Sequence, residues 1–414
     1  ITRLNRQGSH DLRSNLDVYG LQQYGTAGVL AYQNAIGSLP TNNYTAGQFD
    51  AFDNLTGETL ADTILKGNDT CFACTVRCKR VVEAEYRSRK IETMYGGPEY
   101  ETISTFGSYC GIDNLKAISL ASQLCDQYGL DTIGTGATIA FAMECFEHGL
   151  ITVADTHGID LSFGNSDAML SILEQIGRGE GFGKLLGQGS ARAAQVIGKG
   201  SEKFLVTIKG TEMPAHMPQA KKSLGLIYSV NPFGADHQSS EHDPMYEEGT
   251  NEWCLRNLAA LGLVKPQEPG SLSMEKVRFA YITQAFYSAL DSYCLCQFVW
   301  GPAWQMFGPQ EMAEMLQAAT GWDVTVEEIL RVGVRRLNLL RVFNAREGFT
   351  READKLPEKL SMPLGGTGPT AGVAIDPREI EAAKDEYYSL AGWDLETGNP
   401  TPERLAELGL SWIR

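Results

Sequence analysis

Apolar residues recur at intervals of three and four positions along most of the chain after residue 115, which is the spacing of one face of an α-helix. In the strongest segment, Ile139, Met143 and Phe146 follow this spacing, and Gly149 is placed to end the helix. Sustained two-residue alternation, the mark of a half-buried strand, is almost absent. The pattern predicts helices over residues 115–128, 132–148, 168–178, 183–197, 252–261, 274–293, 309–320, 325–345 and 377–391.

Two segments lack this periodicity. Residues 1–66 are rich in Tyr and Gly and predict short helices and loops. Residues 204–249 are dominated by turn formers such as Pro214, Pro232 and Gly234, and a loop-rich stretch of this length is usually functional. We therefore predict a mainly α, multihelical protein with two domains, residues 1–209 and 210–414, the second of which begins with the irregular segment.

Composition and charge narrow the class of protein. The chain has 414 residues, of which 43% are hydrophobic, and its formal net charge is -16. Because nucleic acids and anionic membranes attract positive charge, this balance excludes a general binder of either. No apolar run approaches the about 20 residues of a membrane span, and the polar start around Arg3 and Arg6 lacks a secretion signal. We expect a cytoplasmic protein whose partners are small molecules or other proteins.

Three of the nine cysteines form the motif Cys71-x2-Cys74-x3-Cys78. Thiolates at this spacing suit a 4Fe-4S cluster, in which each iron takes one sulfur from the protein. A zinc turn and buried, unligated cysteines are the alternatives. The motif supplies three ligands, so a cluster requires a fourth from among Cys110, Cys125, Cys145, Cys254, Cys294 and Cys296.

A second pattern occurs twice, in residues 126–131 and again in residues 291–296. Each copy begins with an Asp, has Leu at its fifth position, and ends with Asp131 or Cys296. A carboxylate accepts two parallel hydrogen bonds from an amino-substituted ring such as a pterin, so the two copies could hold a ligand from two sides. The simpler interpretation is a helix stop followed by a helix cap. Repetition of the pattern favours the ligand.

Candidates for acid-base chemistry lie in the irregular segment and shortly after the cysteine motif. The irregular segment contains His216, His237 and His242 as well as Asp236, Glu241 and Asp243. The ordinary pKa of a histidine suits proton transfer near neutral pH. Glu99 and Glu101 follow a Gly-Gly-Pro turn that could direct a carboxylate into a pocket. The alternatives are structural histidines and a pair of solvated acids.

Taken together, these motifs resemble the tungsten-dependent aldehyde ferredoxin oxidoreductase family. The resemblance rests on the cysteine motif with Cys296, the two repeated patterns, and the segments 97–101 and 234–237. Residues 344–351 are similar to the family as well, and the match extends over nearly the whole chain. The resemblance implies the multihelical two-domain architecture of the family's C-terminal domains. It also implies a tungsten held by two pterins (a tungsten bis-pterin), a 4Fe-4S cluster and a magnesium ion.

The resemblance assigns roles residue by residue. Glu101 is expected to orient water near the metal, with Glu99 as the alternative, and His237 is expected to move a proton. The cluster ligands would be Cys71, Cys74, Cys78 and Cys296, and the pterin contacts would be Asp126, Leu130, Asp131, Asp291 and Leu295.

The sequence departs from the family in two places. Cys294 stands where the family pattern has glycine, which bears on backbone freedom at that position. Family members also carry an N-terminal β-rich domain that forms the base of the cofactor site, and no segment of this sequence corresponds to it. Part of the pterin phosphate and magnesium binding is therefore not accounted for by these residues.

The function implied is oxidation of an aldehyde with water to a carboxylic acid, with two electrons leaving through the cluster to ferredoxin or to a dedicated iron-sulfur subunit. The bases after the cysteine motif, Lys79, Arg80, Arg87, Arg89 and Lys90, form a candidate docking patch, or else an ordinary solvated face. Homo-oligomers and hetero-oligomers both remain open.

Three alternatives remain. The same architecture serves benzoyl-CoA reductase catalytic subunits, which reduce an aromatic ring and act on a CoA thioester. A non-catalytic electron-transfer or scaffold subunit would lack tungsten. Molybdenum could replace tungsten, because both metals fit a site with two dithiolenes.

Overall fold

The structure is a computed structural model that describes residues 1–3, 6, 15–302 and 307–413. These residues form two compact units. The cysteine-motif unit contains residues 20–220 and 357–374, and the cavity unit contains the described residues of 1–19, 221–356 and 375–414. Both units are built mainly from helices, which confirms the predicted fold class.

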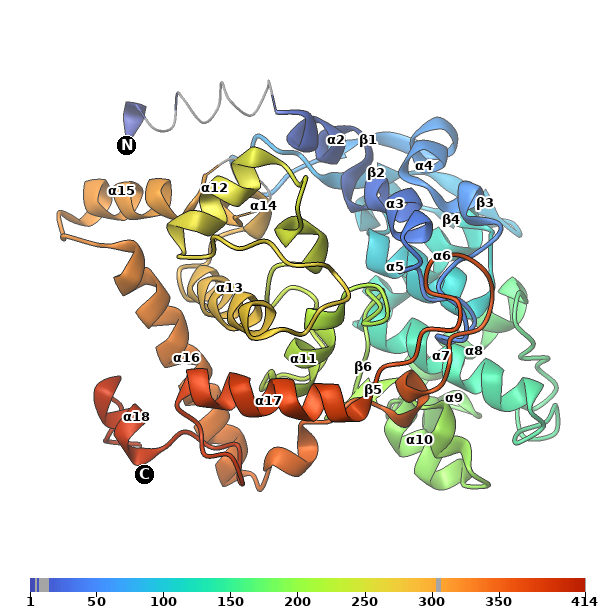
Figure 1. The fold of residues 1–414 in the computed structure, drawn as a ribbon. Coiled ribbons are helices and arrows are strands. Elements are labelled where there is room, and N and C mark those ends of the chain that lie inside the picture. Colours follow the sequence, from blue (N-terminus) through green and yellow to red (C-terminus); the bar gives the residue numbers. More distant parts are fainter. Residues whose placement is uncertain (4–5, 7–14, 303–306, 414) are drawn as a thin grey trace. The chain divides into compact units, whose positions relative to one another are not determined.

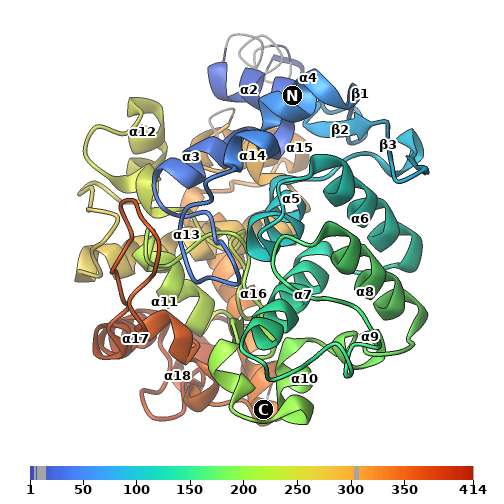
Figure 2. The same ribbon diagram turned by 90° about the vertical axis from the view of Figure 1, so that its right-hand side faces the viewer.

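The cysteine-motif unit is organised around α7 (Thr132–Glu147), which is buried from Thr135 to Cys145. Helices α5 and α8 pack against it, and α6 packs against α8 (Figure 2). The other α-helices are α3 (Leu30–Ala35), α4 (Gly57–Thr63), α5 (Tyr100–Phe106), α6 (Leu115–Tyr128), α8 (Ser166–Arg178), α9 (Gly183–Leu186) and α10 (Ser190–Ile197), while α2 (Leu16–Tyr24) crosses the unit boundary. The 3-10 helices are η1 (Gly25–Val29), η2 (Phe52–Leu55), η3 (Thr93–Tyr95), η4 (Ser108–Cys110), η5 (Ser201–Phe204) and η8 (Glu358–Ser361).

The strands of this unit are short antiparallel pairs. β1 (Leu65–Asp69) pairs with β2 (Lys79–Val82), and the cysteine motif lies between them. β3 (Ala84–Tyr86) pairs with β4 (Arg89–Ile91), and β5 (Thr207–Ile208) pairs with β6 (Thr211–Glu212). Segments of two to five residues are too short for a period-two pattern to stand out in the sequence, so none of them was predicted.

The cavity unit is organised around α13 (Met274–Ser292), which packs against α11, α16 and α17 (Figure 1). A Cβ atom on Gly333 of α16 would lie 1.7 Å from the carbonyl oxygen of Ala285, so the close approach of α13 and α16 requires glycine there. The remaining helices are α11 (Lys222–Val230), η6 (Asp243–Tyr246), α12 (Glu252–Ala260), α14 (Gln297–Trp300), α15 (Pro309–Thr320), α16 (Val326–Arg346), η7 (Arg351–Ala353), α17 (Pro377–Ala391) and α18 (Pro402–Glu407).

Most of the predicted helices are confirmed within a few residues, but two predictions were wrong. The helix expected over 183–197 is two helices, because Gly187 to Gly189 interrupt it and Gly189 has a φ of +89°. The segment 204–249 is not wholly irregular, because it contains α11. All residues from Ser223 to Val230 are buried, so α11 has no polar face that would reveal its helical period. Among the described residues, no helix has the length and apolar character needed to cross a membrane.

Candidate functional site

The cysteine motif forms a preorganised loop between β1 and β2. The Thr70 hydroxyl donates to the carbonyls of Cys71 (3.0 Å) and Cys74 (2.6 Å). Cys71 is exposed, and Cys74 and Cys78 are half-buried. Soft thiolates on an accessible loop are the ligands that iron-sulfur clusters take from proteins, so this donor set fits a cluster.

Arg80 anchors the base of the cysteine loop. Its side chain is 1% exposed, and its guanidinium donates to the backbone carbonyls of Leu21, Gln22, Gln23, Arg77 and Cys78. Because a buried guanidinium must have its N–H groups satisfied, this network holds the loop against the end of α2. Arg80 is therefore not part of a surface patch.

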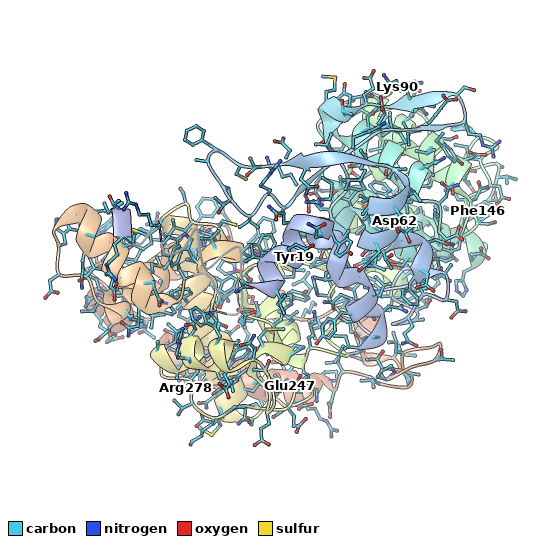
Figure 3. The ribbon with its side chains drawn as sticks, turned by 90° about the horizontal axis from the view of Figure 1, so that it is seen from above. Tyr19, Asp62, Lys90, Phe146, Glu247 and Arg278 are labelled. Carbon is cyan, nitrogen blue, oxygen red and sulfur yellow. The ribbon has the colours of Figure 1, made fainter. Side chains whose placement is uncertain are left out.

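Three of the other bases of the predicted docking patch lie beside acids. Lys90, labelled in Figure 3, lies on β4 at the edge of its unit and is 4.0 Å from Glu83. Arg87 is 2.7 Å from Asp167, and Arg89 is 2.5 Å from Glu174. These pairs offset most of the positive charge expected after the cysteine motif. The docking surface stays a prediction with weaker electrostatic support.

The two copies of the repeated pattern fold into the same turn. In the first copy α6 ends at Gly129, which has a φ of +68°, and the Leu130 N–H donates to the Cys125 carbonyl at 2.9 Å. In the second copy Cys294 has a φ of +55°, and the Leu295 N–H donates to the Leu290 carbonyl at 2.9 Å. Both turns are left-handed helix endings that redirect the chain into the next helix.

The last residue of each copy begins that next helix. Asp131 is the N-cap of α7, where its Oδ2 accepts the Gly134 N–H at 2.5 Å, and Cys296 is the N-cap of α14. The helix-cap interpretation is thus correct for Asp131. Asp126, Asp131, Asp291 and Cys296 are all exposed, and Leu130 and Leu295 are half-buried. These side chains are therefore accessible to a ligand as well.

A cavity of about 490 Å³ lies in the cavity unit beside Asp291. Arg336 Nη1 is 3.0 Å from Asp291 Oδ2 and 3.3 Å from the Ser288 hydroxyl. Asp236 also lines the cavity, and burial raises its pKa. The rest of the wall mixes aromatic, aliphatic and amide side chains, among them Phe233, Phe343, Leu340, Asn344 and Gln284. Apolar walls with a few convergent polar groups fit a planar amino-substituted ring, which is the chemistry of a pterin.

Glu101, at the start of α5, is held by a loop of the same unit. Its Oε2 accepts the Ala215 N–H at 2.8 Å, and its Oε1 is 3.4 Å from His216 Nε2. The loop is tied down in turn by tyrosines: Tyr100 donates to the Ala215 carbonyl at 2.7 Å, and Tyr109 donates to the Met213 carbonyl at 2.9 Å. Glu101 therefore has a fixed orientation and a histidine neighbour.

Glu99 has a different environment. It is the N-cap residue of α5, and its Oε2 accepts the Thr26 hydroxyl, which itself accepts the Tyr100 N–H at 2.9 Å. Burial raises the pKa of Glu99, and the Thr26 hydrogen bond and Arg80 oppose the rise. The two glutamates therefore point to separate partners, and Glu101 is the one that contacts a histidine.

His237 lies in the cavity unit between α11 and η6 and is 9% exposed. Burial, with a smaller contribution from the charge of Lys221, lowers its pKa to about 3. The sequence alone predicts an ordinary histidine, with a pKa near neutrality. The structure instead gives a neutral imidazole, because a charged ring would lose its hydration in this environment.

Comparison with known proteins agrees with the motifs. The family model described as aldehyde ferredoxin oxidoreductase, domains 2 and 3, matches residues 3–410. The chain belongs to the aldehyde ferredoxin oxidoreductase family. The resemblance inferred from the sequence is confirmed at the level of the family.

Several relatives place the chain within the aldehyde ferredoxin oxidoreductase family. A tungsten-containing aldehyde ferredoxin oxidoreductase of Pyrococcus abyssi is 34% identical over 396 residues, which cover 94% of this chain and 60% of that protein. The WOR-like subunit of an aliphatic sulfonate oxidoreductase from Pyrococcus furiosus is 29% identical, covering 82% of this chain and 50% of that protein. The chain thus spans about 60% of the length of the aldehyde ferredoxin oxidoreductases it matches.

One solved structure shares the fold of this family member. It is the active-site complex BamBC of benzoyl-coenzyme A reductase with 1,5-dienoyl-CoA, and the TM-score is 0.68 at 20% identity. The likeness covers 86% of this chain and 55% of the matching chain. At this identity the likeness shows the architecture alone.

The residues predicted for the site are divided between the two units. The cysteine-motif unit contains Cys71, Cys74, Cys78, Glu99, Glu101, Asp126, Leu130 and Asp131, and the cavity unit contains His237, Asp291, Leu295 and Cys296. Two neighbours of these residues were not singled out from the sequence. His216 was a candidate for acid-base chemistry but ranked below His237, and Arg336 was one of several arginines on a predicted helix. The functional roles of the predicted residues stay predictions.

Proposed function

We propose that this chain forms the two helical domains of a tungsten-pterin oxidoreductase that converts an aldehyde and water into a carboxylic acid, two protons and two electrons. The observation that carries the proposal is the repeated turn, which presents an acid and a leucine from each unit and ends at Asp131 in one copy and Cys296 in the other. Membership of the aldehyde ferredoxin oxidoreductase family supports it.

The residues that would hold the cofactors are those of the motifs. Cys71, Cys74, Cys78 and Cys296 would ligate a 4Fe-4S cluster. The pterins would be contacted by Asp126, Leu130, Asp131, Asp291 and Leu295, with a magnesium ion at their phosphates. When bound, these groups supply a Lewis acid, an acceptor for two electrons and a route for passing them on singly.

The chain's own side chains have two tasks in this proposal. Glu101, with one oxygen fixed by the Ala215 N–H, orients a water molecule and accepts its proton as that water adds to the aldehyde carbon. His237 is neutral, and a neutral imidazole has one acceptor nitrogen and one N–H. The acceptor nitrogen would take up the released proton, and the N–H would donate to the substrate oxygen. Two protons and two electrons leave for each aldehyde oxidised.

The electrons are proposed to pass to ferredoxin or to a dedicated iron-sulfur subunit of a larger complex. The pairing of Arg87, Arg89 and Lys90 with acids gives an acidic carrier less positive charge to dock on than the sequence suggested. The weaker electrostatic support for an acidic carrier favours, of the two proposed partners, the dedicated iron-sulfur subunit.

The test is metal analysis followed by turnover. The protein that contains this chain is purified without oxygen, and tungsten, molybdenum, iron and zinc are measured per chain. Tungsten with about four irons, together with aldehyde-dependent reduction of a viologen dye, is the expected result. Zinc alone, or iron without tungsten or molybdenum, would reject the proposal in favour of a scaffold subunit.

Substrate choice is tested on the same preparation. An aromatic CoA thioester with a low-potential electron donor serves as the competing substrate, because it reports ring reduction rather than aldehyde oxidation. Consumption of the thioester without aldehyde oxidation would assign the chain to the other reaction. If the purified protein contains molybdenum and no tungsten and still oxidises the aldehyde, the proposed reaction stands and the assigned metal changes to molybdenum.

A further inference from the structure

The segment that carries His237 is closed by the side chain of His242. His242 Nε2 lies 2.9 Å from the backbone carbonyl oxygen of His237. A carbonyl oxygen only accepts hydrogen bonds, so Nε2 must carry the ring proton and donate it. This contact makes a six-residue loop, from His237 to His242, whose two ends are tied together.

The other ring nitrogen of His242 faces a buried lysine. Lys221 Nζ is 3.3 Å from His242 Nδ1, and Lys221 is 1% exposed. An ammonium group donates hydrogen bonds and has no lone pair, so Nδ1 must accept. The two contacts of the ring, made with groups far apart in the chain, thus require the same Nε2–H tautomer.

Surrounding contacts hold this arrangement in place. Burial and the charge of Lys221 keep the pKa of His242 well below its usual value, so the ring does not gain a second proton that would face the ammonium. Glu241 Oε1 accepts the His242 backbone N–H at 3.0 Å, and Glu241 Oε2 accepts the hydroxyl of Tyr287 on α13 at 2.8 Å. The loop is therefore attached to the long central helix of its unit.

From this geometry we propose that Lys221 and His242 are positioning residues for His237: His242 holds the backbone of His237, and Lys221 selects the tautomer of His242 that can do so. The inference rests on the proposed role of His237. It is not a proton relay, because the path from Lys221 through His242 ends on a backbone carbonyl, which cannot pass a proton to the imidazole. The assembly acts by fixing where the His237 ring sits.

The tautomer can be observed directly. The anaerobically purified protein is labelled with 15N-histidine, and long-range 1H–15N spectra at about pH 7.5 distinguish Nε2–H from Nδ1–H rings for the 6 histidines. The His242→Gln spectrum assigns the His242 signals. We expect a single Nε2–H form in the wild type and in Lys222→Met, and a mixture that includes the Nδ1–H form in Lys221→Met.

Variants at His242 separate positioning from packing. Glutamine keeps an N–H that can reach the His237 carbonyl, whereas leucine fills similar space without a donor. We expect His242→Leu and Lys221→Met to lower kcat for aldehyde oxidation at least about tenfold, because a small displacement of a reacting group costs that much or more. KM should change less than kcat, and His242→Gln should recover most of the rate.

Folding is checked by the thermal midpoint of each variant. If Lys221→Met does not fold, the leucine and glutamine pair at His242 carries the test. A wild-type Nδ1–H tautomer, an unchanged His242 tautomer in Lys221→Met, or equal kcat values for the leucine and glutamine variants would each overturn the inference. A wild-type protein that oxidises no aldehyde rejects the proposed function instead, and the tautomer readout then still decides the geometry.

Discussion

His216 Nε2 lies 3.4 Å from Glu101 Oε1, while the other oxygen of Glu101 accepts the N–H of Ala215, the residue just before His216. Two adjacent residues of one loop thus contact both oxygens of a carboxylate that is only 12% exposed, and one of these contacts is a hydrogen bond. A carboxylate held in this way has one orientation, which is what a group that places a water molecule needs.

Glu101→Gln is predicted to lower kcat for aldehyde oxidation by about 10²- to 10⁴-fold, the usual contribution of a positioned base. Glutamine keeps the shape and loses the ability to take a proton. Glu58→Gln, at an exposed position of α4, is the matched control and should have the wild-type rate. Steady-state kinetics of Glu99→Gln complete the set, and a loss confined to that variant would transfer the role to Glu99.

Cys296→Ser is predicted to lower the iron content of the anaerobically purified protein, whereas Cys294→Ser should keep it. Both thiols are exposed and stand two positions apart, so general oxidation or loss of folding should affect both variants alike. Iron is measured per chain together with the visible absorption of the cluster. Equal iron in the two variants would remove Cys296 from the ligand set.

Cys294→Gly is predicted to raise the free energy of unfolding by about 1 kcal/mol, because a non-glycine residue in the left-handed region costs about that much. Cys294 has a φ of +55°. The matched change is Gly129→Ala, where φ is +68° and nothing lies within 4 Å of an added Cβ, and it should lower stability by a similar amount. Urea unfolding of the wild type and the two variants measures both changes in the free energy of unfolding. Changes in the same direction for Cys294→Gly and Gly129→Ala would contradict the conclusion that the two copies form the same turn.

Acid is predicted to destabilise the fold partly through His237. Burial lowers the folded pKa of His237 from 6.5 to about 3, so between these values the unfolded chain binds a proton that the folded chain does not. The free energy of unfolding therefore falls as pH decreases through this window, and the stabilisation is fully present above it. His237→Gln should weaken that pH dependence.

The acid prediction is measured by urea unfolding at about pH 7.5 and pH 5, where the ordinary histidine pKa lies between the two conditions. Burial lowers the pKa of His242 as well, so His237→Gln removes one part of the slope rather than all of it. His157→Gln is the control because His157 is exposed. If His237→Gln and His157→Gln show the same change in the free energy of unfolding between the two pH values, His237 is not held neutral by burial.

Lys276→Met is predicted to lower the free energy of unfolding by about 3–5 kcal/mol, because it leaves a buried carboxylate without its counter-ion. Lys276 Nζ is 3.1 Å from Asp243 Oδ1, and both side chains are 0% exposed. Lys265→Met is the control, since its pair with Glu275 is largely exposed and such pairs contribute about 1 kcal/mol or less. Chemical denaturation of both variants tests the prediction, and similar losses would contradict it.

Much of the helical content was predictable because it is encoded locally. Helices with one apolar face and a clear start and stop, such as α6 with Asn114 before it and Gly129 after it, show their period and their caps in the sequence. Helix α11 was missed because its buried surface extends around the whole helix. The strand pairs were missed because a short strand is stabilised by pairing with its partner strand, and a segment of a few residues does not show that partner in its own sequence.

The sequence by itself determined the family, the predominance of helices and the two repeated patterns, because each depends on residue types at short, regular spacing. Only the tertiary structure decided that His216 lies beside Glu101, that Arg336 pairs with Asp291, that Arg80 is buried, and that His242 binds the backbone of His237. These outcomes depend on burial and on contacts between residues distant in the chain. Burial also decides which histidines stay neutral, because the cost of losing hydration is a property of the surroundings and not of the residue.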